Sequence, residues 1–177
     1  MPCCIFSFVQ RALSKDDILE YCLSGDALTR HRQKLVKDGL YSIIFSLRNI
    51  KTIQARNIEE QIIKLFIPDE NYLHFHAVLF ECLMEKVSYL LQDKRYDDAI
   101  ISMQEMLYHA KKYDNITINT SIYKYTAPFF DMLEVDSNKF IRTGTSTQTE
   151  DFYEWLNNQQ FDPIRERVDF KKLNVIQ

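Results

Sequence analysis

The chain has 177 residues, enough for one domain with a substantial buried core that needs no metal or disulfide to fold. Hydrophobic residues make up 46% of it and charged residues 27%, which excludes an intrinsically disordered chain. The net charge of -3 argues against a protein that coats nucleic acid, because such proteins carry a basic excess. With only 3 Gly and 4 Pro, which interrupt helices, the composition favours an all-α fold.

The first predicted elements are helices. Ser14 can cap a short helix over residues 14–24, and Asp26 can cap a second, longer helix whose leucines and isoleucines recur at helical spacing. Gly39 lies inside that second helix, where we expect either a close packing contact or a break. A third helix is predicted over residues 57–67, and Pro68 ends it.

The strongest helical signal lies in residues 71–113. Helices over 71–92 and 96–113 flank the short polar turn QDKR, so the two helices should pack antiparallel. The small side chain of Ala99 predicts the point where they approach most closely, with larger apolar residues filling the groove around it. This pair resembles one tetratricopeptide repeat (TPR) of about 34 residues.

From Asp114 the helical periodicity fails. Residues 114–148 are rich in Thr, Ser and Asn and also hold several aromatic residues, so we expect an ordered loop, with short helical turns at most, that packs its aromatics on the helices. A last full helix is predicted from residue 149 or 150 to 157. The tail should hold one or two further helical turns, with Pro163 at a helix start.

A longer resemblance extends over nearly the whole chain. The segments KDDILEYCLSGDAL, LFIPDENYLHFH, HAKKYDN, YTAPFFDMLEVD and FDPIRERVDF follow one another in a characteristic order. That order resembles the C-terminal TPR-like region of Firmicute transcriptional regulators that begin with a helix-turn-helix of the Cro/C1 type. The resemblance implies a cytoplasmic, non-catalytic protein without a cofactor that is either a fragment or a shortened relative of such a regulator.

The same resemblance implies an architecture. Residues 1–177 would form a single all-α domain of antiparallel helix pairs stacked in a short right-handed superhelix. In it, residues 14–67 are the leading helices, 71–113 the best TPR-like pair, 114–148 the ordered loop and 149–173 the capping helices. The closing motif implies that Phe161, Ile164 and Phe170 seal the last exposed helix face.

A partner-binding surface is predicted on the first helix of the best pair. In helical repeats the first helix of each pair lines the concave side, where peptides or partner helices bind. Glu81, Met84 and Ser88 fall about one turn apart on that helix and supply a carboxylate, an adaptable thioether and a hydroxyl. We therefore expect a peptide or protein partner there, with a second copy of the chain (a homodimer) as one such partner.

The alternative function is direct DNA binding. Residues 14–38 have the outline of a helix-turn-helix, and Arg30, Arg32, Lys34 and Lys37 give the second helix a basic face. A solvated cationic face explains the same residues, and the helix is longer than a recognition helix needs to be. Direct nucleic-acid binding by this chain alone is therefore the weaker expectation.

Signals for catalysis, metals and membranes are missing from the sequence. His74 and His76 are two residues apart, about 200° on a helix, so they cannot chelate one metal ion; we expect one in the core and one facing solvent. No nucleophile or phosphate-binding motif is present, which leaves a small hydrolase or transferase as the least supported hypothesis. Neither a signal peptide nor a membrane span is expected. Cys3, Cys4, Cys22 and Cys82 lack zinc-ligand spacing and are predicted to be reduced.

Overall fold

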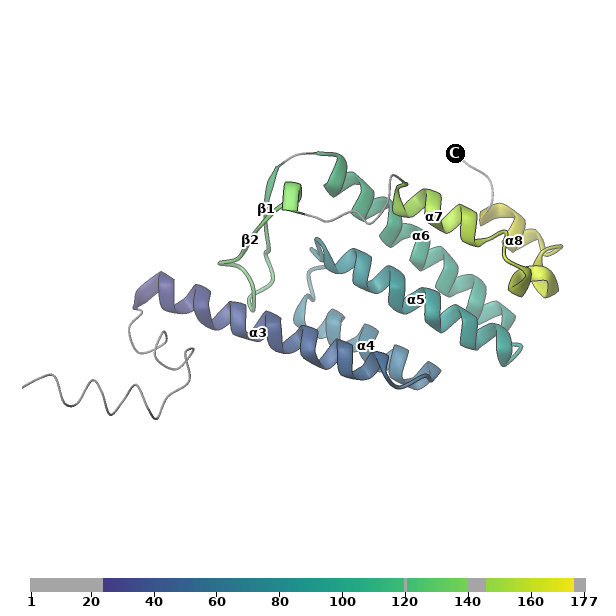
Figure 1. Ribbon diagram of the computed structural model, residues 1–177, viewed down its shortest axis with the longest axis horizontal. Coiled ribbons are helices and arrows are strands. Elements are labelled where there is room, and N and C mark those ends of the chain that lie inside the picture. The colour runs from purple at the N-terminus through teal and green to yellow at the C-terminus, as the bar shows by residue number, and fades with distance from the viewer. Residues whose placement is uncertain (1–23, 120, 140–145, 174–177) are drawn as a thin grey trace, which may run out of the picture.

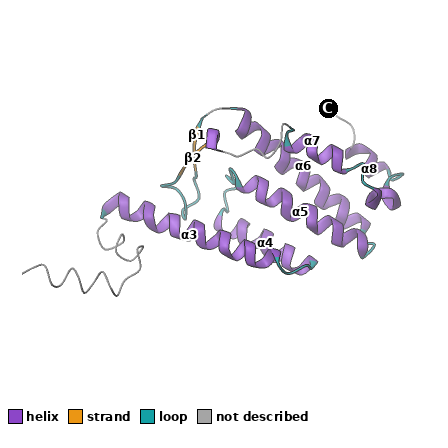
Figure 2. Ribbon diagram, viewed as in Figure 1, coloured by secondary structure: helices purple, strands orange, loops and turns teal. Residues whose placement is uncertain are grey.

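The computed structural model describes residues 24–119, 121–139 and 146–173, and these are mostly helical. Helices pack side by side along the length of the molecule (Figure 1). One short two-stranded sheet interrupts the helical order (Figure 2). The all-α prediction is therefore confirmed at the level of fold class. The helix predicted over 14–24 lies almost entirely outside the described residues, as do Cys3, Cys4 and Cys22.

Helix α3 (Gly25–Arg48) is the predicted long second helix. Asp26 lies in its first turn and Arg48 in its last, so both side chains oppose the partial charges of the helix ends. The expectation for Gly39 is wrong on both counts. The helix runs through it without a break, and a Cβ built there would meet nothing within 4 Å.

Helix α4 (Ile53–Phe66) runs back behind α3 (Figure 1). It begins four residues before the predicted start at Asn57, because the Thr52 hydroxyl accepts a hydrogen bond from the Ala55 N–H at 3.2 Å. The predicted end is confirmed to within one residue, since α4 stops just before Ile67 and Pro68.

Helices α5 (Phe75–Gln92) and α6 (Tyr96–Ile118) form the predicted antiparallel pair and have the most extensive contact in the fold (Figure 1). Ala99 is fully buried between larger apolar side chains, as its size predicted. Lys94, in the turn between the helices, has φ +59, a conformation that favours Gly. The predicted start of α5 at Asn71 is wrong, because Leu73 has φ +48 and cannot continue a right-handed helix.

The stretch predicted as a loop, 114–148, contains regular structure at both ends and in the middle. α6 continues to Ile118, five residues beyond the predicted end. Strands β1 (Ile122–Lys124) and β2 (Glu134–Asp136) then pair antiparallel, with Tyr123 opposite Val135. The short 3-10 helix η1 (Ser137–Lys139) follows directly. The prediction that the loop packs its aromatics inward is confirmed for two of them, because Tyr125 and Phe130 are buried.

The C-terminal part holds α7 (Gln148–Trp155), the 3-10 helix η2 (Gln159–Ile164) and α8 (Val168–Leu173). A complete capping box at Thr147 and Glu150 starts α7. Pro163 lies inside η2 and not at a helix start, which corrects that prediction. The expected burial of the closing motif is confirmed for three apolar side chains, namely Phe161, Ile164 and Phe170.

Two apolar clusters form the core. One joins α5 and α6 to α7, η2 and α8, and it contains the three closing-motif residues. The other joins α3, α4 and the start of α5 to the segment around the hairpin. Gln33 ties that segment to α3: its amide nitrogen donates to the Pro128 carbonyl and the Asp131 carboxylate, and its amide oxygen accepts from the Met132 N–H at 2.8 Å. Residues about a hundred positions apart are thus joined by partly buried hydrogen bonds.

Candidate functional site

The predicted partner-binding residues Glu81, Met84 and Ser88 lie on one face of α5, between α3 and the C-terminal segment. Glu81 is exposed, and its carboxylate accepts a hydrogen bond from Arg48 Nη1 at 2.6 Å. Met84 is partly buried against the C-terminal apolar cluster. Ser88 lies 3.3 Å from the Gln160 side-chain oxygen and donates back to the Met84 carbonyl at 3.2 Å.

The structure therefore brings these three side chains onto one surface and gives each a protein neighbour. Glu81 extends that surface toward α3, and Ser88 extends it toward η2. Leu90 lies about 180° around α5 from Glu81 and borders a cavity of about 170 Å³ between α4 and α6. The predicted face is thus separate from this cavity.

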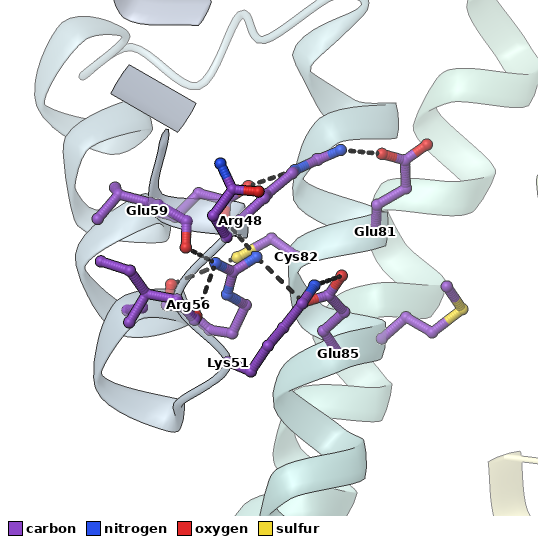
Figure 3. Close-up of polar contacts among 12 residues, drawn as sticks. Arg48, Lys51, Arg56, Glu59, Glu81, Cys82 and Glu85 are labelled. Carbon is purple, nitrogen blue, oxygen red and sulfur yellow. Dashed lines mark hydrogen bonds and ion pairs between the residues drawn. The ribbon is translucent and has the colours of Figure 1, made fainter. Parts of the chain in front are cut away.

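An ionic network beneath the Glu81 end of this face joins three helices (Figure 3). Arg48 at the end of α3 donates through Nε to Glu59 Oε1 at 3.1 Å, in addition to its bond to Glu81. Arg56 of α4 donates through Nη1 to Glu85 Oε2 of α5 at 3.2 Å and lies 2.9 Å from Glu59 Oε2. Lys51 approaches Glu85 to 3.7 Å. Three cations thus balance three carboxylates.

The centre of this ionic network is fully buried. The side chains of Arg56 and Glu59 are 0% exposed, and Arg56 Nε has no hydrogen-bond partner. Arg56 also donates through Nη2 to the Leu47 carbonyl at the end of α3, where a cation complements the helix dipole. Burial raises the pKa of Glu59, while the guanidinium groups of Arg48 and Arg56 act against that rise.

Cys82 lies next to this ionic network and is buried, as expected for a structural thiol. Its Sγ–H donates to the Arg56 carbonyl at 3.3 Å. Burial raises the pKa of the thiol far above its ordinary value, with Glu59 adding to the rise. A thiol held neutral in this way is a poor nucleophile.

The basic residues of the DNA-binding alternative are spread around α3. Arg30, Lys34 and Lys37 recur at helical spacing on one face, whereas Arg32 is about 200° away from Arg30. Arg30, Arg32 and Lys34 are exposed. The Lys37 ammonium instead lies 5.7 Å from the centre of the Tyr125 ring, and burial lowers its pKa. The four cations therefore do not form one surface.

The histidines occupy two separate interior positions. Nδ1 of His76 lies 2.8 Å from Nδ1 of His109 in the α5–α6 interface, and both rings contact Tyr72 edge to face. His74 Nδ1 lies 2.6 Å from the Tyr125 hydroxyl. The two neighbouring histidines point to different partners, as their spacing predicted. His76 is buried, as one of the two was expected to be. His74 is half-buried and does not simply face solvent, because its ring stacks on Tyr41 and bonds to Tyr125.

Burial keeps these three rings neutral at physiological pH. It lowers the pKa of His74 to about 3, with the Lys37 charge acting in the same direction. It also holds the pKa values of His76 and His109 well below their ordinary value. Across the described ranges, no three His, Cys, Asp or Glu side chains are grouped as metal ligands would be.

Sequence reasoning missed Arg48, Arg56 and Glu59. Charged side chains in a helical pattern are normally expected to face solvent, which is why these three were not predicted. A weak signal existed: Arg56 and Glu59 are three apart on α4, at positions that continue the stripe of Ile63. Such a stripe normally carries only apolar residues.

In the part of the chain that the structure describes, no helix is both long enough and apolar enough to span a bilayer. Comparison with known proteins gives no match: no family model fits the sequence, and no curated protein and no solved structure resembles it significantly.

Proposed function

We propose that the chain is a non-catalytic, TPR-like interaction module that binds a peptide or protein partner on the α5 face carrying Glu81, Met84 and Ser88. In this proposal α3–α4, α5–α6 and α7–α8 are successive helix pairs, and α3, α5 and α7 line the binding side. The contacts of α4 with α5 and of α6 with α7 support it, because stacked repeats touch mainly their neighbours.

The observation that carries the proposal is the position of the α5 face. It lies between two flanking elements, with an exposed carboxylate at one end and a hydroxyl at the other. Met84 between them is partly exposed and can adapt its shape to an apolar side chain. A partner bound here would contact α3, α5 and η2 together. In a bacterial transcriptional regulator, or a shortened relative of one, such binding would favour one arrangement of the repeats over another.

A peptide library displayed on phage tests this proposal. Peptides enriched on the full chain should bind in solution, as measured by isothermal titration calorimetry. Glu81→Gln and Met84→Ala should each weaken binding by about tenfold. Glu134→Gln, an exposed carboxylate of β2, is the matched control and should leave affinity unchanged. Enriched peptides that bind all of these variants equally would contradict the proposal, and so would a failure to enrich any peptide.

Direct DNA binding is the alternative, and the exposure of Arg30, Arg32 and Lys34 favours it. Gel-shift titrations at low and moderate salt separate it from the first proposal. Loss of tight, sequence-selective binding in the double variant Arg30→Ala with Arg32→Ala would support the alternative. Weak binding that disappears with salt would instead be the response of an exposed cationic helix.

A further inference from the structure

A second site is suggested by a cavity of about 230 Å³ where α5, α6, the turn before α5 and strand β1 meet. It is separate from the α5 face described above, because His76, which lines the cavity, is about 140° around the helix from Glu81. Buried and exposed side chains both line it, among them Glu70, Leu73, His76, Tyr108, Lys112 and Ile116.

The turn that forms one wall of the cavity has a strained backbone. Glu70 has φ +61 and Leu73 has φ +48, and both side chains line the cavity. Within the described ranges only one other non-glycine residue, Lys94, has a positive φ. Strained conformations of non-glycine residues persist where the surrounding structure holds them, and they concentrate at ligand-binding sites.

The deepest polar side chain of the cavity is His76. A separation of 2.8 Å between its Nδ1 and that of His109 requires a single hydrogen between the two nitrogens. His109 Nε2 is buried without a hydrogen-bond partner, and the nearest carboxylate oxygen, Glu105 Oε1, is 3.9 Å away. A proton on His109 Nε2 faces the Glu105 carboxylate, which also binds the Lys64 ammonium at 2.7 Å. In that tautomer His109 accepts at Nδ1 and His76 donates. His76 Nε2 is then a lone-pair acceptor.

Opposite charges lie among the exposed residues of the same cavity. Lys112 is exposed, and its ammonium lies 5.5 Å from the centre of the Tyr108 ring. Glu70 is also exposed and belongs to the facing turn. Leu73 and Ile116 are buried and supply an apolar wall. The cavity therefore combines an acceptor and an anion with a cation and a small apolar surface.

We propose that this cavity binds a small free α-amino acid. The ligand's ammonium group donates to the Glu70 carboxylate and to His76 Nε2, and its carboxylate binds the Lys112 ammonium. Its side chain packs on Leu73 and Ile116. The volume of the cavity fits a small amino acid. It equals the volume of roughly seven to eight water molecules, at about 30 Å³ each, and is smaller than that of a pocket for a drug-sized ligand.

The test is calorimetric titration of the full chain with L-alanine, L-valine and L-leucine, three sizes of one ligand class. Isobutylamine and 3-methylbutanoate are valine without its carboxylate and without its ammonium group. At least one amino acid should bind. For valine, each truncated analogue should bind at least about tenfold more weakly, because all contacts of one charged group are lost.

Two exposed substitutions tie binding to this cavity. Glu70→Gln and Lys112→Met should each lower amino-acid affinity by about tenfold. Lys111→Met, the exposed neighbour on α6 that does not line the cavity, is the matched control and should leave affinity unchanged. The proposal would be overturned if none of the three amino acids, each at about 10 mM, gave heat in the titration or shifted NMR signals of the protein. That concentration is above the dissociation constants of typical ligands. Equal affinity of all the variants would overturn it too.

Discussion

Acid should destabilise this protein well above the pH at which its carboxylates titrate, because His74, His76 and His109 are buried and neutral. In the unfolded chain each ring has a pKa near 6.5 and gains a proton as the pH falls. In the folded protein the pKa values are lowered, so the rings stay neutral. The neutral rings contribute fully to the stability of the folded protein above about pH 6.5. This contribution is lost as the pH falls toward the pKa values of the folded protein.

The size of this effect follows from the unfolded chain alone. Between pH 7.5 and pH 5.0, protonating one histidine of ordinary pKa stabilises the unfolded state by about 2 kcal/mol. Three histidines give at most about 6 kcal/mol, a large part of the stability of a typical domain. Glu59 acts in the opposite direction, because a raised carboxyl pKa favours the folded state as the pH falls, so the net loss is smaller.

Urea unfolding followed by far-ultraviolet circular dichroism at the two pH values measures the net loss. His109→Asn places an amide near the position of Nδ1 and removes one titrating ring. It should therefore reduce the difference in unfolding free energy between the two pH values by about 2 kcal/mol, whatever it costs at pH 7.5. Tyr125→Phe removes the hydroxyl at His74 and no group that titrates between pH 5.0 and pH 7.5, and should cost about 1 kcal/mol at both pH values. Equal stability of the wild-type protein at the two pH values would contradict the prediction, and so would a His109→Asn protein that keeps the full difference.

Three further predictions concern stability and use urea unfolding at neutral pH. Arg56→Met and Glu59→Leu should each cost about 3–5 kcal/mol, because each removes the fully buried partner of a buried charge, which then keeps only its partly exposed partner, and the double variant should cost clearly less than their sum. Additive losses would contradict this. Phe161→Ala should cost about 3–5 kcal/mol, because it removes a buried ring from the C-terminal cluster. Val168→Ala, at an exposed position, should cost at most about 0.5 kcal/mol. Thr147→Ala should cost about 1 kcal/mol through loss of the α7 cap, and an unchanged unfolding midpoint would exclude that role.

The helix pair in the middle of the chain could be predicted because its signals are local and agree with one another. Apolar residues recur at helical spacing in α5 and α6, and the buried Ala99 follows a short polar turn. The extension of α6 to Ile118 could not be predicted, since Asn and Thr are poor helix formers. Tertiary contacts stabilise that extension: the Asp114 carboxylate accepts from the N–H groups of Gln148 and Thr149 at the start of α7.

The hairpin and the ionic network depend on partners far away in sequence. A strand as short as Ile122–Lys124 shows no alternation that distinguishes it from a loop. Arg48, Arg56 and Glu59 are ordinary surface types. The meeting of three helices buries Arg56 and Glu59 and leaves Arg48 partly exposed. The candidate face on α5 is a prediction from the resemblance to helical repeats together with helical spacing, and neither signal identifies its neighbours on α3 and η2.

The hydrogen bonds of Gln33 constrain how the chain can mature on the ribosome. Its partners Pro128, Asp131 and Met132 are made about a hundred residues later, which at roughly 5–20 residues per second is a delay of about 5–20 s. During that interval the Gln33 side chain lacks the three groups that it binds. A nascent polypeptide halted before Met132 should therefore be cut by proteases near Gln33 more readily than the full chain.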